Sequence, residues 1–102
     1  LIPVVEILYL KADLKYVTAR TREREYLLDE SLTQLEQEFG QQFIRLHRSA
    51  LAAREAIVGF EKSGPEDAEP QWQALLRDIP ERLPVSRRQW PLLRSYARQL
   101  GS

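Results

Sequence analysis

The sequence predicts a single, mainly β domain in which small antiparallel sheets are joined by short turns and accompanied by two short helices. Its 102 residues are the size of one domain, and 43% hydrophobic with 29% charged residues can support a core. Roughly seven or eight short apolar segments follow one another through polar turns, which favours antiparallel pairing. Two other segments show helical periodicity beside capping residues. We therefore expect one domain over residues 1–102.

Three strands are predicted near the N-terminus, over 5–11, 16–21 and 25–28. Each is rich in β-branched or aromatic residues, with partial alternation of apolar and polar positions. The connections at 12–15 and 22–24 are short and polar, as turns between strands are. Strands joined in this way form an antiparallel meander.

A helix is predicted to begin after Ser31, a residue type preferred at the N-cap. Gln34, three residues later, completes a capping box. The apolar side chains share one stripe, formed by Leu32, Leu35 and Phe39. Gly40 ends the helix. A helix this short needs to pack against the strands in order to be stable.

Further strands are predicted in the second half of the chain, at 43–46, 56–62, 71–77 and 82–85. Gly59 inside the second of these indicates a bulge. The segment Ala50–Ala53 is small and apolar, and its pattern assigns it to no strand. Residues 63–70 contain a glycine, two prolines and three acids, and they predict a solvated loop.

A second helix is predicted near the C-terminus, with Ser86 as its candidate N-cap. Its apolar positions share one face, made of Trp90, Leu93, Ala97 and Leu100. Pro91 would lie past the first turn if the helix began at Arg87. Either the helix begins near Pro91 after one irregular turn, or it is kinked. Trp72 and Trp90 are predicted to pack in the core.

The composition excludes several kinds of site. The chain has no cysteine, which rules out disulfides and Cys-based zinc sites, and no apolar run approaches the roughly 18 residues that span a membrane. His47 is the one histidine, and no catalytic or metal-binding pattern accompanies it. We expect no enzyme activity, metal, cofactor or membrane association. Because the chain begins with Leu1, we expect it to be part of a longer protein. The absence of cysteine suits a reducing cytosol, so we expect that protein to be cytoplasmic.

The charges are segregated along the chain although the formal net charge is zero. Residues 55–81 carry seven acids and two bases, whereas residues 82–102 carry five arginines and no acid. A basic face can therefore form despite the neutral total. Most of the cations are arginine, whose guanidinium can fork onto phosphates and guanine edges. A GC-rich genome would produce the same bias.

Two predicted strands each end in a cluster of serine and arginine. The clusters are Arg45, His47, Arg48 and Ser49 at the end of 43–46, and Ser86, Arg87 and Arg88 after 82–85. In the first turn, Lys15 is a candidate for a phosphate contact, and Tyr16 could stack or donate a hydrogen bond. We predict that these side chains form one surface for phosphates and base edges. Two alternatives stay open: His47 could make a structural hydrogen bond, and the arginines could hold an anion or an acidic peptide.

Several blocks of the chain, taken in order, resemble the LytTR DNA-binding domain family. They are Val5–Leu10, Ala12–Val17, Ser31-Leu32 with Leu35-Glu36, Phe43–Ser49 and Leu83–Arg88. Together they cover nearly the whole chain, and it is most similar to the alginate-regulator type. The resemblance implies an elongated β-β-β arrangement of small antiparallel sheets. It also implies the output domain of a bacterial two-component transcription regulator, with a receiver domain elsewhere in the same chain.

Members of this family bind double-stranded DNA at paired repeats, with a possible dimer on the DNA, and they insert loops into successive major grooves. The resemblance places Lys15 or Tyr16 on the first loop. It matches Arg48 to a contact position, and it places Arg87 and Arg88 around another, of which Arg88 is favoured for bases. Three features depart from the family pattern, namely Ala52-Ala53-Arg54 after the His-x-Ser block, a lengthened acidic loop, and Pro91 in the final helix.

Overall fold

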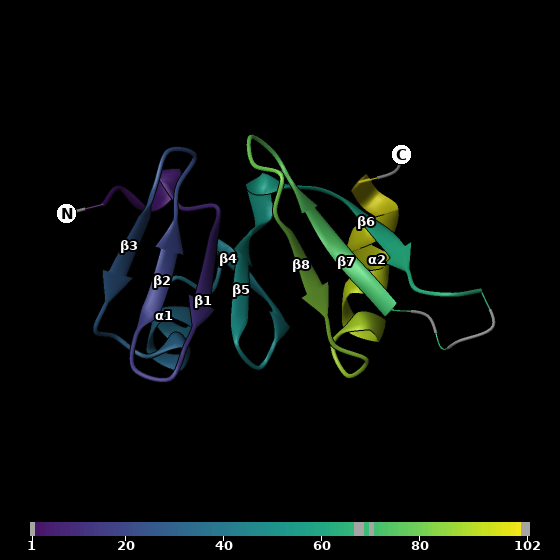
Figure 1. Ribbon diagram of the computed structural model, residues 1–102, viewed down its shortest axis with the longest axis horizontal. Coiled ribbons are helices and arrows are strands. Elements are labelled where there is room, and N and C mark those ends of the chain that lie inside the picture. Colours follow the sequence, from purple (N-terminus) through teal and green to yellow (C-terminus); the bar gives the residue numbers. More distant parts are fainter. Residues whose placement is uncertain (1, 67–68, 70, 101–102) are drawn as a thin grey trace.

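The computed structural model describes residues 2–66, 69 and 71–100, which form two antiparallel sheets side by side (Figure 1). The elements are β1 (Tyr9–Ala12), β2 (Val17–Arg20), β3 (Glu25–Leu28), α1 (Leu32–Glu38), β4 (Phe43–His47), β5 (Ala50–Ala53), β6 (Ile57–Ser63), β7 (Gln71–Leu76), β8 (Arg82–Val85) and α2 (Trp90–Leu100). Short 3₁₀ helices lie at Val4–Glu6 and Arg54–Ala56. The molecule measures 44 × 30 × 24 Å, which makes it elongated. The elements and the dimensions together confirm the predicted mainly β, elongated form with two helices.

The first sheet has the strand order β3-β2-β1-β5-β4, with every neighbouring pair antiparallel. On the central strand β1, Leu10 lies opposite Ala19 of β2 and Leu51 of β5. Helix α1 adds Leu32 and Leu35 to the same buried cluster. Burying a leucine side chain contributes roughly 1.5–3 kcal/mol, so this packing holds the short helix in place.

Helix α1 begins and ends where the sequence predicts. The Ser31 Oγ accepts from the Gln34 N–H at 3.1 Å, and the Gln34 Oε1 accepts from the Ser31 N–H at 2.9 Å, which closes the capping box. After Phe39 the chain turns away at Gly40. A Cβ at Gly40 would lie 2.8 Å from the carbonyl oxygen of Glu36, so glycine is required at this exit.

The second sheet has the order β6-β7-β8, and α2 packs on one of its faces. Leu93 of α2 is buried with Ala74 of β7 and Val85 of β8. The Trp72 ring stacks on the Trp90 ring, with centroids 4.1 Å apart and planes inclined by 11°. Both tryptophans pack against the core, as predicted.

The two sheets are joined where β4 lies beside β8. The Ser86 N–H donates to the Leu46 carbonyl oxygen at 3.0 Å, and Leu46 is fully buried in a core shared with Leu83. A second tie is the hydrogen bond from Arg20 Nε to Glu81 Oε2, at 2.7 Å. This bond from Arg20 lowers the pKa of Glu81, outweighing the opposing effect of burial. Together these contacts fix one sheet against the other.

Two strand predictions for the first half are corrected by the structure. The strand predicted over 5–11 begins only at Tyr9, because Val4–Glu6 forms a 3₁₀ helix in which the Ile7 N–H donates to Val4 at 3.1 Å. The segment Ala50–Ala53 forms β5, to which the sequence assigned no strand. Its first three residues are buried on both faces of the strand, so the alternation that identifies a half-exposed strand is missing.

The predictions for the second half are confirmed with small shifts. The register between β6 and β7 shifts between Ile57 and Gly59, which is the expected bulge. Helix α2 begins at Trp90 after an irregular turn, so Pro91 lies in the first turn, where no N–H is needed. Strand β6 extends to Ser63, and positions 67, 68 and 70 of the predicted loop lie outside the described residues.

Candidate nucleic-acid interface

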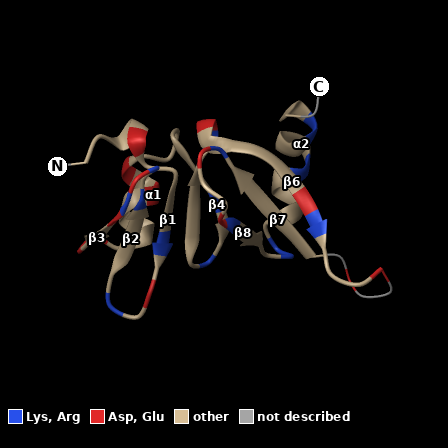
Figure 2. Cartoon of the chain, turned by 45° about the horizontal axis from the view of Figure 1, so that its top comes forward, with Lys and Arg blue, Asp and Glu red and all other residues tan. Residues whose placement is uncertain are grey.

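Three turns lie along one long edge of the molecule (Figure 1), and we call this the three-turn edge. They are the β1–β2 turn (13–16), the β4–β5 turn (48–49) and the β8–α2 turn (86–89). Basic residues occur in all three (Figure 2). The turns carry four basic side chains and one acid, namely Lys15, Arg48, Arg87, Arg88 and Asp13. On the opposite edge, the turns at 21–24 and 77–81 carry acids and bases interspersed.

The β1–β2 turn is closed by its own hydrogen bonds. The Asp13 N–H donates to the Tyr16 carbonyl oxygen at 2.8 Å, and the Asp13 Oδ1 accepts from the Leu14 N–H at 2.8 Å. An aspartate that caps its own turn holds the tip in one conformation. Lys15 and Tyr16 are both exposed there, as a contact role requires.

The β4–β5 turn consists of Arg48 and Ser49, and three hydrogen bonds fix it. The Ser49 N–H donates to the His47 Nδ1 at 3.1 Å, the Arg45 Nη1 donates to the Arg48 carbonyl oxygen at 2.9 Å, and the Ala12 N–H donates to the Ser49 carbonyl oxygen at 2.8 Å. The Arg48 side chain takes part in none of them and is exposed, with no hydrogen bond or ion pair to the described residues. The turn therefore presents Arg48 outward from a fixed backbone.

Arg45 has a structural environment that differs from that of Arg48. Its Nη2 lies 2.6 Å from the Glu36 Oε1 of α1, and its side chain is only 17% exposed. Arg45 therefore ties α1 to β4 and supports the neighbouring turn through the Arg48 carbonyl. The predicted cationic cluster loses one member, because this guanidinium is already paired with a carboxylate.

His47 orients the β4–β5 turn. Since its Nδ1 accepts a hydrogen bond, the proton of the neutral ring lies on Nε2. The Nε2 is buried, and no described residue pairs with it. Burial lowers the pKa of His47, and the nearby charges of Lys11, Arg45 and Arg48 lower it further. The structure thus supports the hydrogen-bonding interpretation of His47, and its buried Nε2 is not placed to reach a phosphate.

The β8–α2 turn is capped by Ser86, whose Oγ accepts from the Gln89 N–H at 3.2 Å. Arg87 is exposed and forms an ion pair with Glu69. Arg88 is exposed as well, and its side chain contacts no acid in the part of the chain that the structure describes. The bond from Ser86 to Leu46 places this turn next to the β4–β5 turn, so the two predicted clusters do converge.

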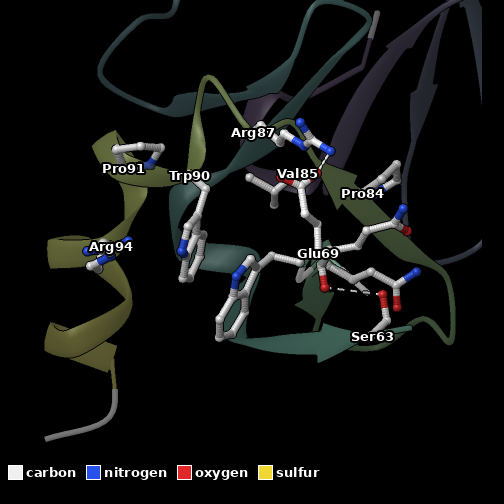
Figure 3. A pocket seen from close by; sticks show the side chains of 11 residues that line it. Ser63, Glu69, Pro84, Val85, Arg87, Trp90, Pro91 and Arg94 are labelled. Atoms are coloured by element: carbon white, nitrogen blue, oxygen red, sulfur yellow. Dashed lines mark hydrogen bonds and ion pairs between the residues drawn. The ribbon is translucent and has the colours of Figure 1, made fainter. Parts of the chain in front are cut away.

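An open cleft of about 840 Å³ lies beside the β8–α2 turn (Figure 3). The residues that line it include Trp72, Trp90 and Pro84, together with the basic residues Arg87 and Arg94. The cleft combines aromatic surface with two guanidinium groups, and Glu69, the ion-pair partner of Arg87, lines it as well. An anionic ligand would take the place of Glu69 beside Arg87. The cleft is the feature that keeps an anion- or peptide-binding role under consideration.

The sequence analysis missed one basic residue of this region, Lys11. It is exposed on β1, directly opposite Ala50, the first residue after the Arg48–Ser49 turn. A lysine that interrupts an otherwise apolar strand was the available signal.

No group of three or more metal-ligating side chains occurs among the described residues. None of the described helices is long and apolar enough to cross a membrane.

Comparison with known proteins gives concordant results. The sequence profile described as the LytTr DNA-binding domain matches residues 1–98. The positive alginate biosynthesis regulatory protein of Pseudomonas aeruginosa is 51% identical over 63 residues, which are 62% of this chain and 25% of that protein. The LytTr DNA-binding domain of a putative methyl-accepting/DNA response regulator from Bacillus cereus superposes with a TM-score of 0.68 and 26% identity, over 99% of this chain and 85% of that one. The chain thus spans about a quarter of the length of the P. aeruginosa protein it matches.

Proposed function

Because the chain belongs to the LytTR family of DNA-binding domains, we propose that it reads specific double-stranded DNA sequences through the three-turn edge. Its relatives are a biosynthesis regulatory protein and a response regulator. The chain would accordingly be the output domain of a bacterial two-component transcription regulator, acting in the cytoplasm with a receiver domain in the same polypeptide.

One observation supports this proposal most strongly. The Arg48 turn and the Arg88 turn belong to different sheets, yet the hydrogen bond between Ser86 and Leu46 fixes one beside the other. Neither guanidinium is bound to a carboxylate of the described chain, so both are available to a ligand. Because the backbone of both turns is already held, only the two arginine side chains would have to be ordered when they fork onto guanine edges.

The basic residues of the edge divide into two roles. Arg48 and Arg88 would read bases, since hydrogen bonds hold the backbone of their turns and their planar groups can form paired hydrogen bonds with guanine. Lys15 would contact a phosphate as a point charge and set the position of the domain on the duplex. Tyr16, exposed beside it, would donate to the DNA backbone. Arg87 would also contact the DNA once its ion pair with Glu69 is broken.

The zero net charge has a consequence for affinity. Nonspecific attraction to DNA is weak for such a domain, so binding would rest on sequence-specific contacts and on two copies at paired repeats. We propose a dimer on the DNA for that reason. Its half-sites would be separated by about one helical turn, roughly 34–36 Å, or a multiple of it.

Selection of bound duplexes from a random pool tests the proposed function. We expect enrichment of a pair of short repeats, and mobility shifts of the enriched duplex that weaken as salt is raised. Arg22→Ala serves as a control for the loss of one positive charge, because Arg22 is exposed on the opposite edge. This variant should bind the enriched duplex as the unsubstituted protein does. An unchanged pool after repeated selection would refute the proposal.

The cleft beside Trp72 and Trp90 favours a second candidate function, an anion- or peptide-binding interaction module. In that case the intrinsic tryptophan fluorescence would respond to an acidic peptide, and it would be unaffected by the duplex. If the three-turn edge binds DNA, the fluorescence should instead respond to the duplex and be unaffected by the acidic peptide.

A further inference from the structure

The most exposed large apolar side chain of the described residues lies on the three-turn edge. It is Leu14, which is 99% exposed at the tip of the β1–β2 turn. Single apolar residues on a surface are common and need no explanation in themselves. Leu14 differs because its turn is one of the three that line the three-turn edge (Figure 1). The next residue is Lys15, and the other two turns carry Arg48 and Arg88.

The turn holds Leu14 away from the rest of the protein. Below the tip, Ala12 pairs with Val17 in the ladder of β1 and β2. The Leu14 N–H is bound to the Asp13 Oδ1, and the Asp13 N–H is bound to the Tyr16 carbonyl oxygen. This closed turn leaves Leu14 no route to its own core. It is an exposed apolar group on a turn whose backbone is held by its own hydrogen bonds.

We infer that Leu14 contacts the C5-methyl group of a thymine in the major groove, and this inference rests on the proposed function. Thymine is the base that presents an apolar group in that groove, and apolar side chains are its usual partners. The neighbouring Lys15 would bind a phosphate at the groove wall, which brings the turn tip to the level of the bases. The domain would then recognise a guanine through arginine and a thymine through leucine on the same site.

The magnitude follows from the area that the methyl group buries. The free energy gained by burying one methyl-sized group, converted into a ratio of dissociation constants, corresponds to about a fourfold change in affinity. The base pair, its hydrogen-bonding edge and the phosphate backbone are all unchanged when thymine is replaced by deoxyuridine. Substituting the thymines of the selected duplex one at a time therefore measures this contact alone.

The test measures the affinity of four proteins for the enriched duplex and for duplexes in which each thymidine in turn is replaced by deoxyuridine. The unsubstituted protein should lose about fourfold in affinity at one thymine position. Leu14→Ala should bind the thymine and deoxyuridine duplexes equally, and Leu14→Met should restore the preference. Leu27→Ala is the matched control, because Leu27 is 67% exposed on the outer strand β3 and should keep the full preference.

Each outcome is decisive. A fourfold preference that persists in Leu14→Ala, or the absence of any sensitive thymine in the unsubstituted protein, would overturn the role of Leu14 while leaving DNA binding intact. A pool that yields no enriched duplex would overturn the proposed function and this inference with it. Since Leu14 makes no side-chain contact that folding needs, circular dichroism should show the same fold for all four proteins.

Discussion

The backbone N–H of Ser86 donates to the carbonyl oxygen of Leu46 at 3.0 Å, across the junction of the two sheets. Leu46 is followed by His47 and the Arg48–Ser49 turn, and Ser86 is followed by Arg87 and Arg88. This hydrogen bond, together with the buried core that Leu46 shares with Leu83, sets the relative position of two arginine-bearing turns that are far apart in the sequence. It is the structural basis for treating them as one surface.

Arg88→Ala should weaken binding to the selected duplex by about 1–3 kcal/mol and relax the preference at one base pair. The physical reason is the loss of a forked contact with a base edge. Competition binding against duplexes substituted at each position measures both effects, with Arg22→Ala from the opposite edge as the control. Equal losses on the selected and on random duplexes would reject a base-reading role for Arg88.

Lys15→Ala should weaken binding to all sequences by a similar factor. Because a phosphate contact releases a counterion, the slope of log affinity against log salt should become shallower by about 1. Titrations at four salt concentrations measure that slope. If the loss instead concentrated on one base position, Lys15 would be reading a base.

Arg45→Ala should reduce the free energy of unfolding by about 1–2 kcal/mol, because the largely buried guanidinium holds both Glu36 and the Arg48 carbonyl oxygen. Urea unfolding measures the change. A double-mutant cycle with Glu36→Gln should show that the two losses are coupled. Unchanged stability together with a shallower salt dependence of binding would mean that Arg45 contacts phosphate instead.

Acidification from pH 7.5 to 5.0 should destabilise the domain through His47. The pKa of His47 is lowered in the folded protein by burial and by nearby cations, so below the ordinary value of about 6.5 the unfolded chain binds the proton more readily. This contribution to stability is present above that pH and is lost as the pH falls. The pKa of Glu81 is lowered too, and its contribution is lost only at more acidic pH.

His47→Asn provides the control for this pH dependence, because its amide oxygen can accept from the Ser49 N–H and does not titrate. Urea midpoints at pH 7.5 and 5.0 should therefore differ less in His47→Asn than in the unsubstituted protein. The same pH dependence in both proteins would show that His47 is not the responsible group.

The sequence predicted the elements whose determinants are local. The capping box of Ser31 and Gln34 defines α1 without reference to the rest of the chain. Pro91, which cannot lie deep in a helix, left two arrangements open, and the structure has the one with an irregular turn before α2. The strand β5 was missed because burial on both faces removes the alternation by which strands are recognised.

The candidate site residues could be named from the sequence, but the structure was needed to show which of them are already paired within the chain. Both Arg45 and Arg48 are arginines near a strand end, but only the fold brings Glu36 of α1 to Arg45. Likewise, the sequence cannot show that Glu69 pairs with Arg87 while Arg88 contacts no acid of the described chain. Leu14 drew no attention because an apolar residue in a turn is not by itself a binding signal.

The central claim is that DNA binds along the three-turn edge, and an amide NMR titration with the selected duplex tests it most directly. The largest chemical-shift changes should fall on residues 13–16, 47–49 and 86–89. The turns at 21–24 and 77–81 on the opposite edge should change little. Shifts centred on those opposite turns, or on the cleft beside Trp72 and Trp90 alone, would contradict the claim.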